Sequence, residues 1–372
     1  MRLSRHAWWT IWVKGLLSAC LELVASGCQD ERPPIVWEGE HLSFGTHEDT
    51  STICAGTLPY MDAFVGHMGE LFDRPNARVD YYWVPDEVGS YCVSIAGACA
   101  KASEVFSGRV LHKHELVHAA RPEAYLPIEE GIADLYGDQD RLTDPVPDDV
   151  LGLLEAHEHG RYIAENGHYK SLAHFVSYLR VIGGTTSLVE LGRRTAYDGS
   201  FDSLDPVFRE LYGMSLVAIV ERYVETYRAC DQTRHADNGF ECGRNVVRLP
   251  SSDEGAVEYT IPLDCSHPDV VGPHRGERWT TVTLDVPVTA RYHVTIGNAG
   301  RSKIRFRRCG ISCLDERFVA PSIEIGFDGG GHCLLEGRYL LRVAAPESHT
   351  GNATIRIEYS QPASGSCAAP EN

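Results

Sequence analysis

A short segment of this 372-residue chain places two histidines and a glutamate at a spacing suited to metal chemistry. It reads His114-Glu115-Leu116-Val117-His118. Residues i and i+4 are neighbours on one face of a helix, so both imidazoles can bind one Zn²⁺ at about 2.0–2.1 Å. Glu115 lies beside them and can take a proton from a water that the metal activates. The segment therefore predicts a hydrolytic zinc centre with Glu115 as the general base.

Two histidines leave a third ligand to be found, and three acidic residues follow closely in the sequence. Arg121-Pro122 predicts the end of the first helix, because proline lacks a backbone N–H and clashes with the preceding turn. Pro127 favours the start of a second helix. The first turn of that helix carries Glu129 and Glu130, and Asp134 lies one turn beyond Glu130. One carboxylate can bind the metal while another orients a ligand histidine.

These residues resemble the motif of the gluzincin metallopeptidases, which include thermolysin-like and aminopeptidase-N-like enzymes. That group pairs HExxH with a downstream glutamate, often in an E-G-x-A setting, and Glu130-Gly131-Ile132-Ala133 matches it. The resemblance implies that His114, His118 and Glu130 bind zinc. The thermolysin-like pattern E-x-x-x-D implies that Asp134 supports a ligand histidine, His114. The expected activity is peptide-bond hydrolysis.

The spacing departs from the gluzincin pattern in one respect. Eleven residues lie between His118 and Glu130, fewer than in thermolysin or aminopeptidase N. The connection between the two helices is therefore shorter, and Glu129 or Asp134 stays open as the third ligand. The segment after Glu130 is also loosely similar to the aspzincins, whose third ligand is an aspartate.

A later helical pattern begins at Tyr169 and ends at Gly183-Gly184. It resembles an aminopeptidase-N-like helix whose tyrosine donates a hydrogen bond to the developing oxyanion, although the Lys-Gly of that helix is absent here. A phenol keeps its proton at pH 7 and can stabilise charge that appears in the transition state. The resemblance implies this role for Tyr169. The alternatives are a buried structural tyrosine, or His168 or His174 as the donor.

The first 27 residues predict export. Two arginines precede a mostly apolar stretch from Ala7 to Val24, which Lys14 and Glu22 interrupt, so the stretch suits a secretory signal better than a membrane span. The sequence Val24-Ala25-Ser26-Gly27-Cys28 resembles a bacterial lipobox. It implies cleavage before Cys28 and a lipid anchor in the cell envelope, with a soluble extracellular protein as the alternative.

The cysteine count agrees with export. Of twelve cysteines, Cys20 lies in the signal and Cys28 would carry the lipid, which leaves ten, enough for five disulfides. A second zinc site is the less favoured use of these thiols, because they oxidise outside the cytosol. Two local pairs are predicted from their spacing: Cys92 with Cys99 and Cys230 with Cys242.

The length of the chain predicts more than one hydrophobic core. Residues 28–108 indicate a small α/β unit with strands at 35–44 and 78–84 around a helix at 58–72. Residues 109–228 are helical and carry the metal motif, and 229–252 form a cysteine-containing linker. From 253 to 372, alternating apolar and polar residues predict a β-sandwich.

The predicted fold class is therefore α+β: a zincin-like catalytic domain with a helical C-terminal subdomain, followed by an all-β, jelly-roll-like sandwich. The zincin part of this prediction comes from the gluzincin resemblance. In the last part, Glu336-Gly337-Arg338-Tyr339 resembles the bacterial pre-peptidase C-terminal domains that accompany secreted peptidases. The resemblance implies an accessory role in folding or surface binding.

The formal net charge of −18 argues against a nucleic-acid partner, because phosphate binding needs a basic face. The expected partner is a peptide or protein substrate. The competing hypothesis is a cell-surface binding or adhesion protein whose zinc site is structural. Glu115 favours catalysis, since a structural site has no need for a general base.

Overall fold

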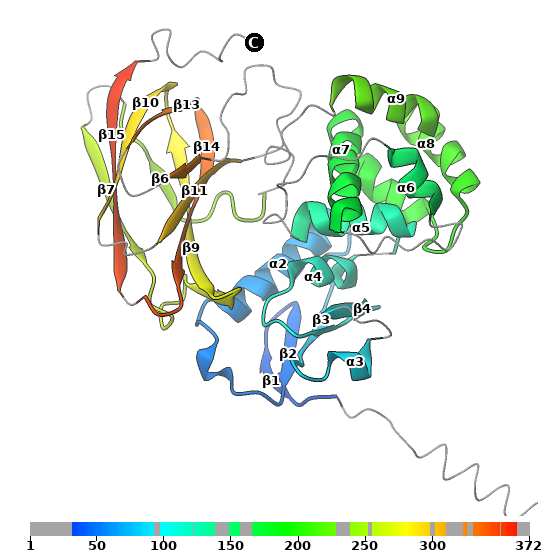
Figure 1. The fold of residues 1–372 in the computed structure, drawn as a ribbon, viewed down its shortest axis with the longest axis horizontal. Helices are drawn as coiled ribbons and strands as arrows, with labels where there is room; N and C mark the ends of the chain where they lie inside the picture. Colours follow the sequence, from blue (N-terminus) through cyan, green and yellow to red (C-terminus); the bar gives the residue numbers. More distant parts are fainter. Residues whose placement is uncertain are drawn as a thin grey trace, which may run out of the picture.

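The structure is a computed structural model that describes residues 32–92, 97–121, 123–137, 149–156, 166–227, 239–251, 255–297, 302–309, 323–325, 330–349 and 351–362. It is a mixed α/β protein with several sheets, which confirms the predicted fold class at that level. Figure 1 shows a small sheet at the bottom, a group of helices above it to the right, and a strand-rich body to the left. The signal-like segment and Cys28 lie outside the described residues.

The first sheet has five strands in the order β1-β2-β3-β5-β4, with β4 at one edge. The β2, β3 and β5 strands are parallel, and β1 and β4 are antiparallel to their neighbours. The strand predicted at 35–44 is instead a hairpin, because Gly39 N–H donates to the carbonyl of Leu42 at 2.8 Å and turns the chain. The strands are β1 (Ile35–Glu38), β2 (Leu42–Thr46), β3 (Val79–Trp83), β4 (Ala98–Lys101) and β5 (Glu104–Ser107).

Helices α2 (Thr57–Leu71) and α4 (Lys113–Ala120) pack on one face of this sheet and share its core. The predicted helix at 58–72 is thus confirmed. The short α3 (Val88–Tyr91) packs on the opposite face through Phe106, whose ring stacks on Tyr91 at 4.5 Å. The sheet therefore forms a rigid base beneath α4, the helix with the two histidines.

The helical region follows α4 and joins the same core. The predicted end of the helix at Gly183-Gly184 is confirmed, because Gly184 interrupts the helical backbone of α7, and a second helical segment then runs to Arg194. Gly184 has φ of 73°, which glycine adopts without steric cost. The helices are α5 (Leu126–Gly137), α6 (Val150–Ala156), α7 (Asn166–Arg194), α8 (Leu204–Tyr212) and α9 (Leu216–Thr226).

The strand-rich body contains two further sheets, ordered β13-β10-β15-β7 and β12-β11-β14-β9-β6, with β8 paired to β9. Apolar side chains of both sheets, such as Tyr292 and Leu341, meet in one core. The strands predicted in this region from alternating residues are present. They are β6 (Val246–Arg248), β7 (Ala256–Pro262), β8 (Val271–His274), β9 (Glu277–Val286), β10 (Ala290–Gly297), β11 (Lys303–Arg308), β12 (Ile323–Ile325), β13 (Gly330–Leu334), β14 (Gly337–Pro346) and β15 (Asn352–Pro362).

Three disulfides join described cysteines, and they are compatible with an exported protein. Cys92 pairs with Cys99, as predicted. The predicted pairing of Cys242 with Cys230 is wrong: Cys242 bonds Cys309, because β6 and β11, which follow and precede these cysteines, belong to the same sheet. The third disulfide joins Cys54 to Cys265. In the described residues, no helix is both long enough and apolar enough to cross a membrane.

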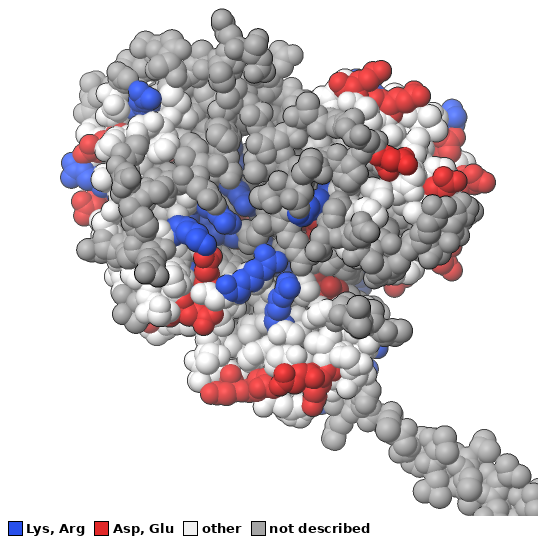
Figure 2. All heavy atoms as spheres, viewed as in Figure 1, with Lys and Arg blue, Asp and Glu red and all other residues white. Residues whose placement is uncertain are grey.

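The strand-rich body is fixed to the rest of the protein by a buried polar contact. Tyr60 on α2 donates a hydrogen bond of 2.6 Å to the carboxylate of Glu241, and Arg342 on β14 donates to the same carboxylate at 2.9 and 3.1 Å. The Arg342 guanidinium also lies 5.1 Å from the centre of the Trp279 ring. Figure 2 shows that lysine and arginine side chains gather in the hollow between the strand-rich body and the part that holds the first sheet and the helices. Acidic side chains lie mainly toward the outer edges.

Glu241 should make the stability of the protein pH-dependent. Burial raises the pKa of Glu241, but Arg342 and Lys113 outweigh it and hold the pKa below the ordinary 4.5. The unfolded chain therefore takes up this proton first as pH falls, so the stabilisation is complete above about pH 4.5 and is lost as pH drops through the folded pKa. Glu241→Gln should flatten the acid limb of a plot of unfolding free energy against pH. The exposed control Glu225→Gln should leave that limb unchanged, and an unaltered limb in Glu241→Gln would contradict the assignment.

Removing the Cys54–Cys265 disulfide should destabilise the protein, because the two cysteines are 211 residues apart and their bond closes a long loop. The double variant Cys54→Ser/Cys265→Ser should lose about 2–5 kcal/mol of unfolding free energy, measured by denaturant titration. Cys92→Ser/Cys99→Ser is the matched control, since that disulfide spans seven residues and should contribute less. Equal losses in the two double variants would contradict the loop-length explanation.

Candidate metal centre

The α4 helix presents its histidines on the face opposite its packing surface. Leu116 and Val117 are fully buried in the core, whereas His114, Glu115 and His118 remain partly exposed. The helix ends at Ala120, as the following Arg-Pro pair predicts. The sequence of α4 thus orients three polar side chains toward one side, where α5 crosses.

Two glycines allow α5 to approach its neighbours closely. A Cβ atom at Gly131 would lie 2.8 Å from the carbonyl oxygen of Leu172, so this glycine lets α5 pack directly against α7. A Cβ atom at Gly137 would lie 2.5 Å from the backbone nitrogen of His114, so the end of α5 abuts the start of α4. These contacts fix the rotation of α5 and therefore decide which of its carboxylates faces the histidines.

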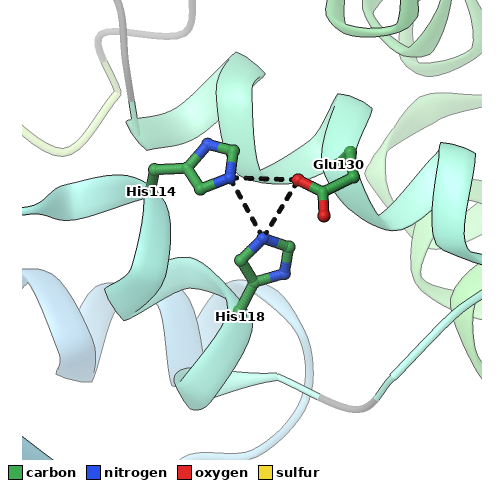
Figure 3. Close-up of side chains that lie close together, drawn as sticks. All are labelled: His114, His118 and Glu130. Carbon is green, nitrogen blue, oxygen red and sulfur yellow. Dashed lines mark hydrogen bonds and ion pairs between the residues drawn. The ribbon is translucent and has the colours of Figure 1, made fainter. Parts of the chain in front are cut away.

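Glu130 is the carboxylate that faces them, and Figure 3 shows its oxygen forming a triangle with the two imidazoles. Glu130 Oε2 lies 3.1 Å from His114 Nε2 and 3.4 Å from His118 Nε2, and the two Nε2 atoms are 3.1 Å apart. Atoms about 2.0–2.1 Å from a tetrahedral zinc lie roughly 3.3 Å from one another. The three atoms therefore match the spacing that a bound zinc ion requires.

Asp134 lies behind His114. Its carboxylate is fully buried, and Oδ1 is 3.3 Å from His114 Nδ1. The contact is not aligned as a hydrogen bond, and within the part of the chain that the structure describes neither carboxylate oxygen of Asp134 has a hydrogen-bond partner. Burial lowers the pKa of His114, but Asp134 and Glu130 outweigh it and raise the pKa well above its ordinary value. A buried carboxylate without a donor, beside an imidazole that favours positive charge, suits a site built to hold a cation.

Glu129 lies on the outer side of His118 and is not part of the group formed by His114, His118 and Glu130. Its Oε1 lies 2.7 Å from Nδ1 of His118, and its Oε2 contacts the guanidinium of Arg121. Glu129 therefore contacts the outer nitrogen of His118, not the nitrogen that faces Glu130. Burial lowers the pKa of His118, but Glu130 and Glu129 outweigh it and raise that pKa to about 9.

Within the described residues, His114, His118 and Glu130 are the group of metal-binding side chains whose ligand atoms come close enough to share an ion. Burial raises the pKa of Glu130, but the two imidazoles outweigh it and hold the pKa well below its usual range. A bound cation would satisfy this ionised carboxylate and allow both imidazoles to be neutral ligands. The donor set of two nitrogens and one oxygen fits a divalent metal ion such as zinc.

The group opens onto a cleft of about 660 Å³. Glu115 and Tyr169 line this cleft together with edge strand β4. The Tyr169 ring lies edge-on to His114 at 5.9 Å between centres. Of the alternative donors, His174 is buried against the Tyr223 hydroxyl, 2.7 Å away, and neither it nor His168 lines the cleft. Of the three proposed donors, Tyr169 is thus the one that the fold brings to the histidines.

The sequence prediction missed Arg121, which appeared only as a helix-ending residue. Its side chain is 1% exposed and is paired with Glu129, which is 4% exposed. The sequence offered one possible signal for Arg121. A buried glutamate close to a metal ligand needs a compensating cation, and Arg121 is a nearby cation. The sequence does not reveal that Glu129 is buried, so Arg121 could not be distinguished from an exposed arginine at a helix end.

Comparison with known proteins gives little further information. No family model and no curated protein matches the chain. Among solved structures, a periplasmic lysozyme inhibitor of g-type lysozyme from Salmonella Typhimurium is 16% identical, and the match covers 31% of this chain and 98% of that protein with a TM-score of 0.20. Aminopeptidase A from Legionella pneumophila, in complex with aspartic acid, is 7% identical, and the match covers 84% of this chain and 34% of that protein with a TM-score of 0.32. The chain spans 34% of that aminopeptidase, and neither similarity is strong enough to assign a fold or an activity.

Proposed function

We propose that this protein is an exported zinc-dependent metallopeptidase. The observation that supports this function most strongly is the convergence of His114, His118 and Glu130 on one wall of an open cleft that Glu115 also lines. Structural zinc sites are commonly closed by four protein ligands, whereas catalytic sites combine three ligands with an open position. Three ligands beside a cleft therefore favour catalysis over the alternative of a binding or adhesion protein with a structural site.

The residues around the cleft would divide the chemistry between them. When bound, zinc would polarise the scissile carbonyl and increase the acidity of a water molecule. Glu115 would accept the proton of that water and pass it to the leaving nitrogen. Tyr169 would donate a hydrogen bond to the oxygen on which negative charge develops. Asp134 would hold His114 through its outer nitrogen.

The remaining regions suit an exported enzyme. A zincin-like domain would comprise the first sheet and helices α2 to α9, and the last two sheets would form a jelly-roll-like accessory sandwich. Edge strand β4 borders the cleft and could pair with an extended peptide substrate. The signal-like segment 1–27 would direct export, and Cys28 would carry a lipid in the bacterial cell envelope.

The proposal can be tested on the mature protein, expressed without residues 1–27. Its zinc content should correspond to a single ion per chain by mass spectrometry, and it should cleave members of a mixed peptide library. Dialysis against a chelator should abolish cleavage, and added zinc should restore it. A protein that binds zinc in this stoichiometry but cleaves no peptide would instead support the binding or adhesion alternative.

A further inference from the structure

The outer nitrogen of His118 is held by a carboxylate that the protein itself fixes in place. The Glu129 carboxylate contacts three groups at once: Oε1 lies 2.7 Å from His118 Nδ1, while Oε2 contacts the Arg121 guanidinium and accepts a hydrogen bond of 2.7 Å from Ala124 N–H. The side chain of Glu129 is 4% exposed. Each contact orients this carboxylate, so its position relative to His118 is fixed by the protein before any metal binds.

Arg121 supplies the permanently charged contact of Glu129. It follows His118 by three residues, and its guanidinium also donates to the Glu129 carbonyl at 3.2 Å. The guanidinium carbon lies 5.6 Å from the centre of the Phe72 ring, and the side chain is 1% exposed. Separating two buried charges leaves each without compensation, which is costly. The pair therefore cannot open without disturbing the connection between α4 and α5.

The contacts of Glu129 account for the short sequence spacing between His118 and Glu130. Residues 121–125 form the whole connection between α4 and α5. Glu129 binds this connection near both of its ends, at Arg121 and at Ala124. The carboxylate that contacts His118 thus also closes the connection that brings Glu130 to the histidines.

We propose that Arg121 is a positioning residue of the metal centre, which acts through Glu129 to hold the His118 imidazole with Nε2 directed at the metal. The His114 side of the centre differs, because Asp134 contacts His114 Nδ1 at 3.3 Å and neither carboxylate oxygen of Asp134 has a hydrogen-bond partner among the described residues. His118 is accordingly the histidine whose orientation is set in advance. This inference rests on the metal-binding part of the proposed function and not on peptide cleavage.

The test compares Arg121→Gln, Arg121→Lys, Glu129→Gln and the double variant Arg121→Gln/Glu129→Gln in the mature protein. Zinc affinity is measured by competition with a chromophoric chelator, and ligand geometry by the visible spectrum of the cobalt-substituted protein. Arg121→Gln should weaken zinc binding about 10–100-fold, the range for residues that orient metal ligands. Arg121→Lys should recover part of that loss, because lysine restores the charge but not the two-pronged geometry of the guanidinium.

The double variant decides whether Arg121 acts through Glu129. If it does, removing both residues should weaken zinc binding no more than the larger single loss, since the two changes break one chain of contacts. The double variant also leaves no unpaired buried charge, so it should fold even where Arg121→Gln does not. Arg193→Gln, which breaks an exposed ion pair with Asp73, is the matched control and should keep wild-type affinity.

Several results would overturn this inference. One is unchanged zinc affinity and an unchanged cobalt spectrum in Arg121→Gln, with a fall only in the melting temperature of the metal-free protein. Another is a double variant whose fold-loss of zinc affinity equals the product of the fold-losses of the two single variants. Wild-type protein that binds zinc but cleaves no peptide would remove the proposed peptidase and leave this inference standing, whereas wild-type protein that binds no divalent metal would remove both.

Discussion

Glu115→Gln is expected to lower kcat for peptide hydrolysis by about 10²–10⁴-fold, the range for loss of a general acid–base group. Glutamine has nearly the same shape as glutamate, but its amide cannot accept a proton from water at neutral pH. Glu115 is not among the three grouped ligand residues, so zinc content should stay at the wild-type level. The measurements are steady-state cleavage of a peptide found in the library and zinc content of the same preparation.

The control for Glu115 is Glu123→Gln, because Glu123 is an exposed glutamate that lines the same cleft. This substitution removes one negative charge from the cleft without touching the histidines, and we expect little change in kcat. If Glu115→Gln retained wild-type activity, or lost no more than Glu123→Gln, Glu115 would not be the general base.

Replacing Glu130 and Asp134 separately should have different effects on zinc affinity. Glu130→Gln removes the carboxylate oxygen that lies 3.1 and 3.4 Å from the two Nε2 atoms, so we expect affinity to fall by more than about 100-fold. Asp134→Asn leaves all three ligand atoms in place and alters only the contact with His114 Nδ1, so its loss should stay within about 10–100-fold. Chelator competition measures both.

A matched control for this pair is Glu190→Gln, which removes an exposed carboxylate on α7. It should not change zinc affinity. The reverse order of effects, with Asp134→Asn losing the metal and Glu130→Gln keeping it, would make Asp134 the third ligand and would require a rearrangement of α5 on metal binding.

Much of the local structure around the metal centre follows from sequence. The spacing of His114 and His118 places both imidazoles on one face of a helix whatever that helix packs against, because the helical repeat fixes the direction of each side chain. The Arg121-Pro122 and Pro127 signals likewise locate the end of α4 and the start of α5, since proline restricts its own backbone and that of the residue before it. Alternation of apolar residues identified the main strands of the last two sheets for the same reason.

The choice among the carboxylates did not follow from sequence. Glu129 and Glu130 are adjacent, so they point in directions about 100° apart around the helix axis. Which one faces the histidines depends on the rotation of α5, and that rotation is set by its close contacts with α7 at Gly131 and with α4 at Gly137. These are contacts between segments distant in sequence, and no local pattern encodes them.

The same distinction holds for the cysteines. Cys92 and Cys99 are close enough in sequence for their pairing to be predicted. Cys242 pairs with Cys309 because β6 and β11 join one sheet, and Cys54 pairs with Cys265 because the backbone before α2 hydrogen-bonds to the segment between β7 and β8. The sequence by itself therefore determined the two helices of the metal motif, the main strands of the last two sheets and the kinds of side chain available for chemistry. The tertiary structure alone decided which of those side chains meet, because helix rotation and strand order depend on packing between distant segments, not on the local repeat of the chain.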